Sequence, residues 1–246
     1  EQFDGAIEVM IATWGPFQLL PREVFTALAD SGNVPWGAYD GDRLVGFVLG
    51  WAGVDDEGLH VHSHMLAALP DRRHRGVGYA MKLAQRAQAL EQGIHVARWT
   101  FDPLVARNAW LNLGKLGAFA DRFGRAFYGE MTDDLNRDDR TDRMVVRWEL
   151  DREPGPRAIP GDVPTVLAAK GDPAAPEPTP LKEPGPAGAV LEVPRDHPAL
   201  RERDRALATR WRDAVAVAIE KSFAVGLVVV GFDRERSAYV LGTPGR

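Results

Sequence analysis

The run Arg-His-Arg-Gly-Val-Gly at residues 73–78 is the strongest chemical signal in the chain. It follows an apolar stretch and leads into a helical pattern. Gly76 and Gly78 let the backbone approach an anion without obstruction by a Cβ atom. The N–H groups at a helix start and the helix dipole favour bound negative charge, and Arg73 and Arg75 can add charge-assisted contacts. The spacing predicts a site for a pyrophosphate.

Three histidines, His60, His62 and His64, alternate along the β-like run just before this loop. Alternation places them on one face of a strand, with neighbours roughly 6–7 Å apart. An imidazole can accept a proton near neutral pH, so His62 and His64 are candidate general bases, while His60 is expected to be solvated at the strand entrance. The outer pair is about 13 Å apart on a straight strand, too wide for all three to share a zinc ion. A pair plus a carboxylate stays open, but we expect no metal.

Two familiar phosphate loops do not fit the run 73–78. A dinucleotide-binding loop needs a third glycine where this chain has Met81, and a P-loop needs Ser or Thr after Gly114-Lys115, where this chain has Leu116. What remains is Arg-x-x-Gly-x-Gly. This pattern resembles the acyl-CoA-binding signature of the GNAT acyltransferases.

The order of predicted elements is similar to that family. Asp40-Gly41-Asp42 is a hairpin turn signal, and Gly117 suits a helix C-cap. Hydrophobic periodicity predicts helices over 2–14, 22–30, 77–92 and 104–116, and strands over 34–39, 43–51, 59–69, 95–101, 118–123 and 143–150. The resemblance implies an α/β (α+β) GNAT fold, a central, mostly antiparallel, splayed sheet flanked by helices. The resemblance covers residues 1–151. The amino-acid sequences at 62–66 and 99–104 are similar to those of a subgroup of uncharacterised bacterial and archaeal predicted acetyltransferases.

The amino-acid composition of the chain changes beyond residue 151. Prolines concentrate over 152–188, which predicts a linker or an extended wrapping segment. A small β-α-β-β unit is then expected over 189–246, with one helix at about 198–222. Its core would be thin, so we expect it to pack on the GNAT domain or on a second subunit. It could stabilise or dimerise the protein, or it could cover the acceptor site.

The resemblance also implies how the co-substrate, acetyl-CoA or another acyl-CoA, would be held. The strand before the loop would splay from its neighbour near residues 66–69, where backbone N–H groups of Leu66 and Ala68 would bind the pantetheine arm and the thioester oxygen. The pyrophosphate would bind the backbone N–H groups of His74, Gly76, Gly78 and Tyr79. Asn108 lies near the position where an Asn of the family commonly binds the CoA arm.

The catalytic groups are implied less completely. In some GNAT enzymes a Glu about eleven residues before the loop is the base, and His62 stands there, with His64 as second choice. Where many members have a proton-donating Tyr, this chain has Leu113. The thiolate would then leave unaided, or take a proton from another donor such as Tyr128, or the chain would be inactive. Asp102 could orient a histidine or bind the amine, or it could cap the helix that follows.

These residues predict an N-acyltransferase that moves an acetyl or succinyl group to a primary amine of a small molecule such as an amino acid. The attack would be direct, because the chain has no Cys and nothing marks a serine nucleophile. A CoA-binding or sensing protein that has lost catalysis is the alternative. A metal-dependent hydrolase built on the strand histidines is a third possibility.

Composition limits the remaining choices. The 246 residues are 45% hydrophobic, enough for a packed core. No signal peptide and no apolar run of membrane-spanning length is visible. The net charge of −5 gives no reason to expect nucleic acid as a partner. We therefore expect a cytoplasmic protein that binds neither membranes nor nucleic acid. We also expect a homodimer.

Overall fold

The computed structural model describes residues 2–17, 19–33, 35–72, 76–159 and 161–243. Contacts divide the chain into two compact units. The first runs to Trp99 and includes Glu130–Asp138 and Glu149–Glu153, and the second holds Thr100–Gly129, Asp139–Trp148 and the chain from Pro154 onward. The units cut across the predicted domains 1–151, 152–188 and 189–246. Because compact units need not coincide with a family domain, those boundaries stay a prediction.

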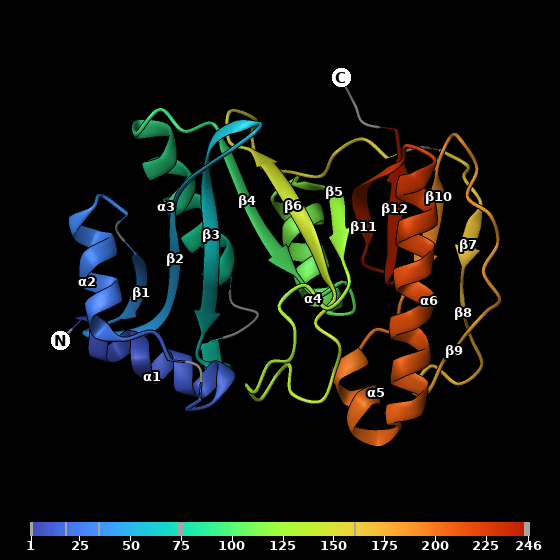
Figure 1. The fold of residues 1–246 in the computed structure, drawn as a ribbon, viewed down its shortest axis with the longest axis horizontal. Helices are drawn as coiled ribbons and strands as arrows, with labels where there is room; N and C mark the ends of the chain where they lie inside the picture. The colour runs from blue at the N-terminus through green and yellow to red at the C-terminus, as the bar shows by residue number, and fades with distance from the viewer. Residues whose placement is uncertain (1, 18, 34, 73–75, 160, 244–246) are drawn as a thin grey trace. The chain divides into compact units, whose positions relative to one another are not determined.

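The first unit has the predicted order of elements (Figure 1). Its strands are hydrogen-bonded in the order β1-β2-β3-β4; β1 with β2 and β2 with β3 are antiparallel, and β3 with β4 is parallel. The predicted hairpin at Asp40-Gly41-Asp42 joins β1 to β2, with Gly41 at φ 59°. The elements are α1 (Gln2–Trp14), α2 (Arg22–Asp30), β1 (Trp36–Asp40), β2 (Arg43–Asp55), β3 (Gly58–Ala68), the 3-10 turn η1 (Pro70–Arg72), α3 (Val77–Glu91) and β4 (Val96–Phe101).

Alternation along β2 gives this sheet two different faces. Val45, Phe47 and Leu49 lie in one hydrophobic core with residues of α1 and α2. Gly46 and Gly50 point to the other face, where α3 packs. A Cβ atom at Gly50 would lie 2.7 Å from the His62 carbonyl and 2.8 Å from Gln85 Nε2. Glycine is therefore required for the close approach of α3 to β2 and β3.

The second unit also follows the expected order, with additions. Its strands are ordered β6-β5-β11-β12-β10-β7, and the long helix α6 packs on them (Figure 1). The elements are α4 (Ala106–Ala109), the π-helical turn η2 (Trp110–Lys115), β5 (Phe119–Gly124), β6 (Arg143–Glu149), β7 (Thr165–Leu167), β8 (Ala169–Lys170), β9 (Glu177–Pro178), β10 (Ala189–Glu192), α5 (His197–Arg203), α6 (Arg205–Ala224), β11 (Val228–Asp233) and β12 (Ala238–Gly242).

Residues 152–188, expected to be a linker or an extended wrapping segment, contain the short strands β7, β8 and β9. β7 pairs with β10 at the edge of the strand order, where neighbouring prolines are tolerated. Two helix expectations needed correction in this unit. The single helix expected over 198–222 is broken at Asp204, whose carboxylate accepts the Leu207 N–H and caps α6. The helix expected over 104–116 changes at Trp110 from α-helical to π-helical. Mixed strands flanked by helices nonetheless confirm the predicted fold class.

Candidate acyl-CoA site

The predicted phosphate loop joins β3 to α3. Arg73, His74 and Arg75 lie outside the described residues. Gly76 directly precedes α3 with φ 82°, a left-handed conformation that favours glycine. No acidic side chain stands in the first turn of α3, so nothing within that turn offsets the positive end of the helix dipole.

The first helical hydrogen bond of α3 runs from the Ala80 N–H to the Gly76 carbonyl at 3.0 Å. Gly78 and Tyr79 therefore lie in the opening turn, whose N–H groups precede the helical ladder. Tyr79 makes further contacts of its own. The geometry is that of an anion-binding helix start, and the assignment of Gly76, Gly78 and Tyr79 to the pyrophosphate stays a prediction.

β3 and β4 part shortly after they meet. Their parallel ladder pairs Val61 with Ala97 and His62 with Arg98, and among these described strands it does not continue along residues 63–68. The family resemblance implies a divergence near residues 66–69, and here it begins earlier. Leu66 and Ala68 pair with Val48 and Gly46 of β2 on their other side. Their predicted contacts with the pantetheine arm stay predictions.

His62 and His64 lie together on the α1 side of the sheet. His62 pairs with Trp51 of β2, and its ring centroid lies 5.0 Å from that of Trp51. The register shifts between Leu49 and Gly50, which pair with Met65 and Ser63, so His64 is the extra residue of a β-bulge. Its ring lies 4.9 Å from Trp51 and 5.7 Å from His62. The bulge thus turns two strand histidines and a tryptophan into one cluster, which we call the histidine cluster.

His62 and His64 are held in the neutral form. Desolvation by burial and repulsion from His64, His60 and Lys82 lower the pKa of His62 to about 4. Desolvation also lowers the pKa of His64, which is the more exposed of the two. Both imidazoles are therefore unprotonated at neutral pH, and His62 is the weaker base.

His60 was expected to be solvated, and that expectation is wrong. Only 9% of its surface is exposed. Its Nδ1 lies 3.2 Å from the Gly58 carbonyl and 3.9 Å from Asp55 Oδ1. Its ring lies beside Gly53, where a Cβ atom would approach within 2.9 Å of Nε2. These contacts with residues around the turn between β2 and β3 give His60 a structural role.

Lys82 lies on the opposite, α3 side of the same strands, and the sequence reasoning missed it. It is 2% exposed, with Nζ 2.6 Å from Ser63 Oγ and 3.7 Å from the centroid of the Trp99 ring. Burial lowers the pKa of Lys82 to about 7. The sequence did contain a signal for this burial. Lys82, Gln85 and Ala89 are spaced so that they lie on one face of α3, and that face is buried.

Three positions that bear on the donor and its leaving group lie in the second unit. Leu113, which stands where many family members have a proton-donating Tyr, is fully buried in η2 and has no proton to donate. The Tyr128 hydroxyl is 2.8 Å from Thr100 Oγ1, and 40% of the residue is exposed. Asn108 lies in α4 and is partly buried. The roles predicted for Tyr128 and Asn108 stay predictions.

Asp102 has partners that account for it without a substrate. Its carboxylate makes two hydrogen bonds with Arg212 of α6, at 2.7 and 2.9 Å. It also accepts the Leu104 N–H at 2.8 Å, as a capping side chain would. Burial alone would raise the pKa of Asp102, but the charge and hydrogen bonds of Arg212 outweigh it and lower the pKa. Amine binding by Asp102 stays a prediction.

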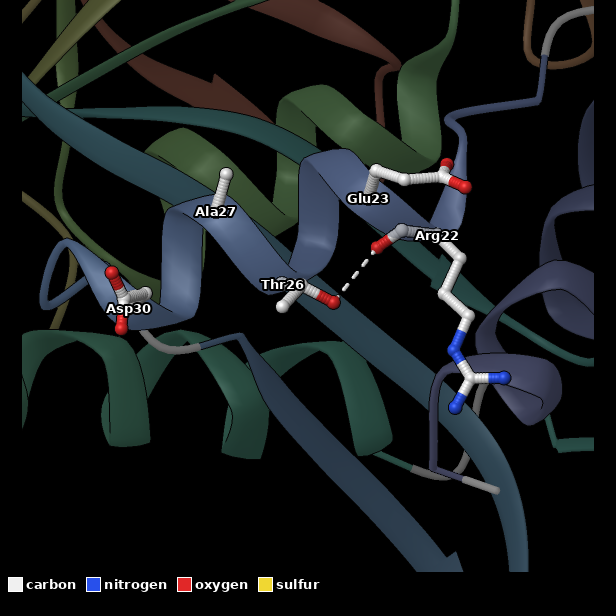
Figure 2. A pocket seen from close by; sticks show the side chains of 5 residues that line it. All are labelled: Arg22, Glu23, Thr26, Ala27 and Asp30. Carbon is white, nitrogen blue, oxygen red and sulfur yellow. Dashed lines mark hydrogen bonds between the residues drawn. The ribbon is translucent and has the colours of Figure 1, made fainter.

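Three further features bear on function. Among the described residues, no group of three or more His, Cys, Asp or Glu side chains is arranged to hold a metal ion. None of the described helices is both long and apolar enough to cross a membrane. A surface pocket lies along α2 and is lined by Arg22, Glu23, Thr26, Ala27 and Asp30 (Figure 2). All its lining side chains come from one short helix, and it contains no predicted site residue.

A family comparison agrees with this geometry. Residues 7–114 match the family model described as the acetyltransferase (GNAT) family. No curated protein matches the chain. Among solved structures, the ribosomal-protein-S18-alanine N-acetyltransferase of Escherichia coli is 16% identical, covers 64% of this chain and 92% of its own, and gives a TM-score of 0.47. Naa50 of Arabidopsis thaliana, solved with a bisubstrate analogue, is 15% identical over 59% and 91%, with a TM-score of 0.46.

The family match spans α1 to η2 and so includes the loop before α3, the divergence of β3 and β4, and the histidine cluster. The chain therefore carries a domain of the GNAT acetyltransferase family, enzymes that transfer an acyl group from acyl-CoA.

Proposed function

We propose that the protein transfers an acyl group, acetyl by default and succinyl as the alternative, from acyl-CoA to a primary amine of a small molecule such as an amino acid. The single observation that carries this proposal is the bulge at His64. It gathers His62, His64 and Trp51 beside the point where β3 and β4 part.

The donor would enter along the diverging strands with its pyrophosphate over the start of α3. Backbone N–H groups of β3 would polarise the thioester carbonyl, because donors aimed at developing negative charge stabilise the transition state. The amine would approach from the face that carries the histidine cluster. It would attack the carbonyl carbon directly, without a covalent enzyme intermediate.

A histidine of the cluster would take the proton that the amine loses. The efficiency of a general base follows its pKa, and the ideal value lies near the working pH. The low pKa of His62 therefore favours His64 as the base. His62 and Trp51 would then position the His64 ring, which packs against both.

The proposal is tested with His64→Asn, with His95→Asn as the matched control. His95 is exposed and pairs with Asp151 on the surface. We expect His64→Asn to lower kcat about 100-fold on an amine that the wild-type protein accepts. CoA affinity, measured by calorimetry, should not change, and His95→Asn should behave as wild type.

The buried Leu113 favours a second candidate, a CoA-binding protein without catalysis. Calorimetry with CoA and a transfer assay across a panel of primary amines separate the two. CoA binding without transfer to any amine, from acetyl-CoA or succinyl-CoA, would overturn the enzyme proposal and leave the second candidate. A homodimer is our proposal for the assembly.

A further inference from the structure

Among the described residues of the first unit, one buried ammonium group has no carboxylate partner. Lys82 projects from α3 against β3 and β4 and is 2% exposed. Its neutral partners are Ser63 Oγ at 2.6 Å and, more weakly, Gln85 Oε1 at 3.5 Å, with the Trp99 ring beneath it at 3.7 Å. Within the described ranges no acidic side chain forms an ion pair with Lys82.

The position of this group is as informative as its burial. His62 and Arg98 are the last residue pair of the β3–β4 ladder. Ser63 and Trp99 are the next residue on each strand, and the Lys82 ammonium contacts both. Lys82 therefore lies where the two strands begin to separate, at the inner end of the opening in which the donor is proposed to bind.

The surroundings of Lys82 provide little to fix its charge. Ser63 of β3, Gln85 of α3 and Trp99 of β4 are uncharged. On the far face of β3, His62 feels the charge of Lys82, which lowers its pKa, but it contributes no negative charge. Buried charges in proteins are normally paired. An anion that forms only during turnover would complete this site.

We infer that Lys82 is the general acid that protonates the CoA thiolate as it leaves. This inference rests on the proposed function. The amine nitrogen forms a bond to the carbonyl carbon while the carbon–sulfur bond breaks, and its electron pair stays on sulfur. The Lys82 ammonium gives one proton to that sulfur. The proton lost by the amine passes through His64 to solvent, and Lys82 regains one from solvent, so the products are an amide and CoA thiol.

The chemistry suits both partners. A thiol has an unperturbed pKa of about 8.5, so a lysine whose pKa lies near 7 can protonate the thiolate favourably. The ammonium also stabilises the thiolate before the proton moves, as cations beside reactive thiols do. Leu113 cannot do either, which removes the proton donor implied by the family resemblance.

The test compares Lys82→Met, which keeps the length and the apolar stem, with Lys170→Met, an exposed lysine on β8. We expect Lys82→Met to lower kcat at least 100-fold and to leave the Kd for CoA unchanged. In the wild-type protein kcat should fall as pH rises above about 7, because the ammonium loses its proton. That alkaline limb should be absent in Lys82→Met, and Lys170→Met should match the wild type.

A second measurement does not depend on turnover. The pKa of the thiol of bound CoA can be followed by the ultraviolet absorbance of its thiolate across a pH series. We expect severalfold more thiolate at pH 7 in the wild-type protein than in Lys82→Met, because the ammonium stabilises the thiolate beside it. Equal thiol pKa values in the two proteins, or a Lys82→Met variant that keeps kcat and the alkaline limb, would overturn the inference.

The outcomes also separate this inference from the proposed function. If wild-type protein binds CoA but transfers no acyl group, the proposed function fails and the thiol pKa still decides the position of Lys82. If transfer occurs and Lys82→Met behaves as wild type, only the inference fails. If CoA does not bind at all, both fail.

Discussion

Two buried cations, one in each unit, show how differently the protein treats an interior positive charge. Arg212 is 3% exposed and Lys82 is 2% exposed. Arg212 contacts two carboxylates, those of Asp102 and Asp139. Lys82 contacts a hydroxyl, an amide and an indole ring. The extent of burial is the same, and only the partners differ.

The difference in partners fixes the protonation states. Desolvation would lower the pKa of Arg212, but Asp102 and Asp139 raise it above its usual value, so the guanidinium stays charged. Nothing comparable opposes the desolvation of Lys82, whose pKa falls to about 7. A fully paired charge is suited to holding elements together, whereas an unpaired one near its pKa is suited to moving a proton.

Removing the paired cation should have the largest effect on stability. Arg212→Met leaves the Asp102 carboxylate buried without its arginine and leaves Asp139 with Arg201 alone, so we expect the free energy of unfolding to fall by about 3–5 kcal/mol. Urea unfolding at pH 7 measures this. Arg210→Met is the matched control, because Arg210 pairs with Glu177 on the exposed side of α6 and should matter little. If Arg212→Met lowered the free energy of unfolding only slightly, the contrast between the paired Arg212 and the unpaired Lys82 would not hold.

Removing the unpaired cation should have the opposite sign. Lys82→Met relieves a buried charge, and we expect it to raise the free energy of unfolding at pH 7 by about 2 kcal/mol. Thermal unfolding of the two proteins at matched pH measures the difference.

The pH dependence supplies the control for that prediction. The folded pKa of Lys82, about 7, lies below its ordinary value of 10.5. The unfolded chain therefore binds more protons between these values, and this group makes stability increase as pH rises from 7 to 10.5. Lys82→Met should lose this rise, and a rise of equal size in both proteins would contradict a depressed pKa.

The smallest effect concerns the hydroxyl that holds Lys82. Ser63→Ala removes its hydrogen bond at 2.6 Å, and we expect a loss of about 1 kcal/mol in unfolding free energy. Because Ser63 accepts from the charged form, its loss should also move the alkaline limb of kcat to lower pH. An unchanged limb with reduced stability would show that Ser63 supports packing alone.

The order of the elements that form the site could be predicted from the sequence, because each element is marked by residues that are close together in the chain. The glycine that begins α3, the hairpin at residues 40–42 and the alternating histidines each depend on residues close in sequence. Asp204 was also a local signal, since an aspartate before a helical pattern is a common cap. The helix break there could have been predicted from the sequence.

The tertiary structure decided what those residues can do. The bulge at His64 arises from the register between β2 and β3 and brings two imidazoles against Trp51. Asp102 and Arg212 meet across 110 residues of sequence. In the sequence, Lys82 is indistinguishable from a lysine on a helix surface, and only the packing of α3 on β3 and β4 buries it. Periodicity predicts which elements form, but pairing, register and burial depend on distant contacts, and these set the charge of Lys82 and of the histidine cluster.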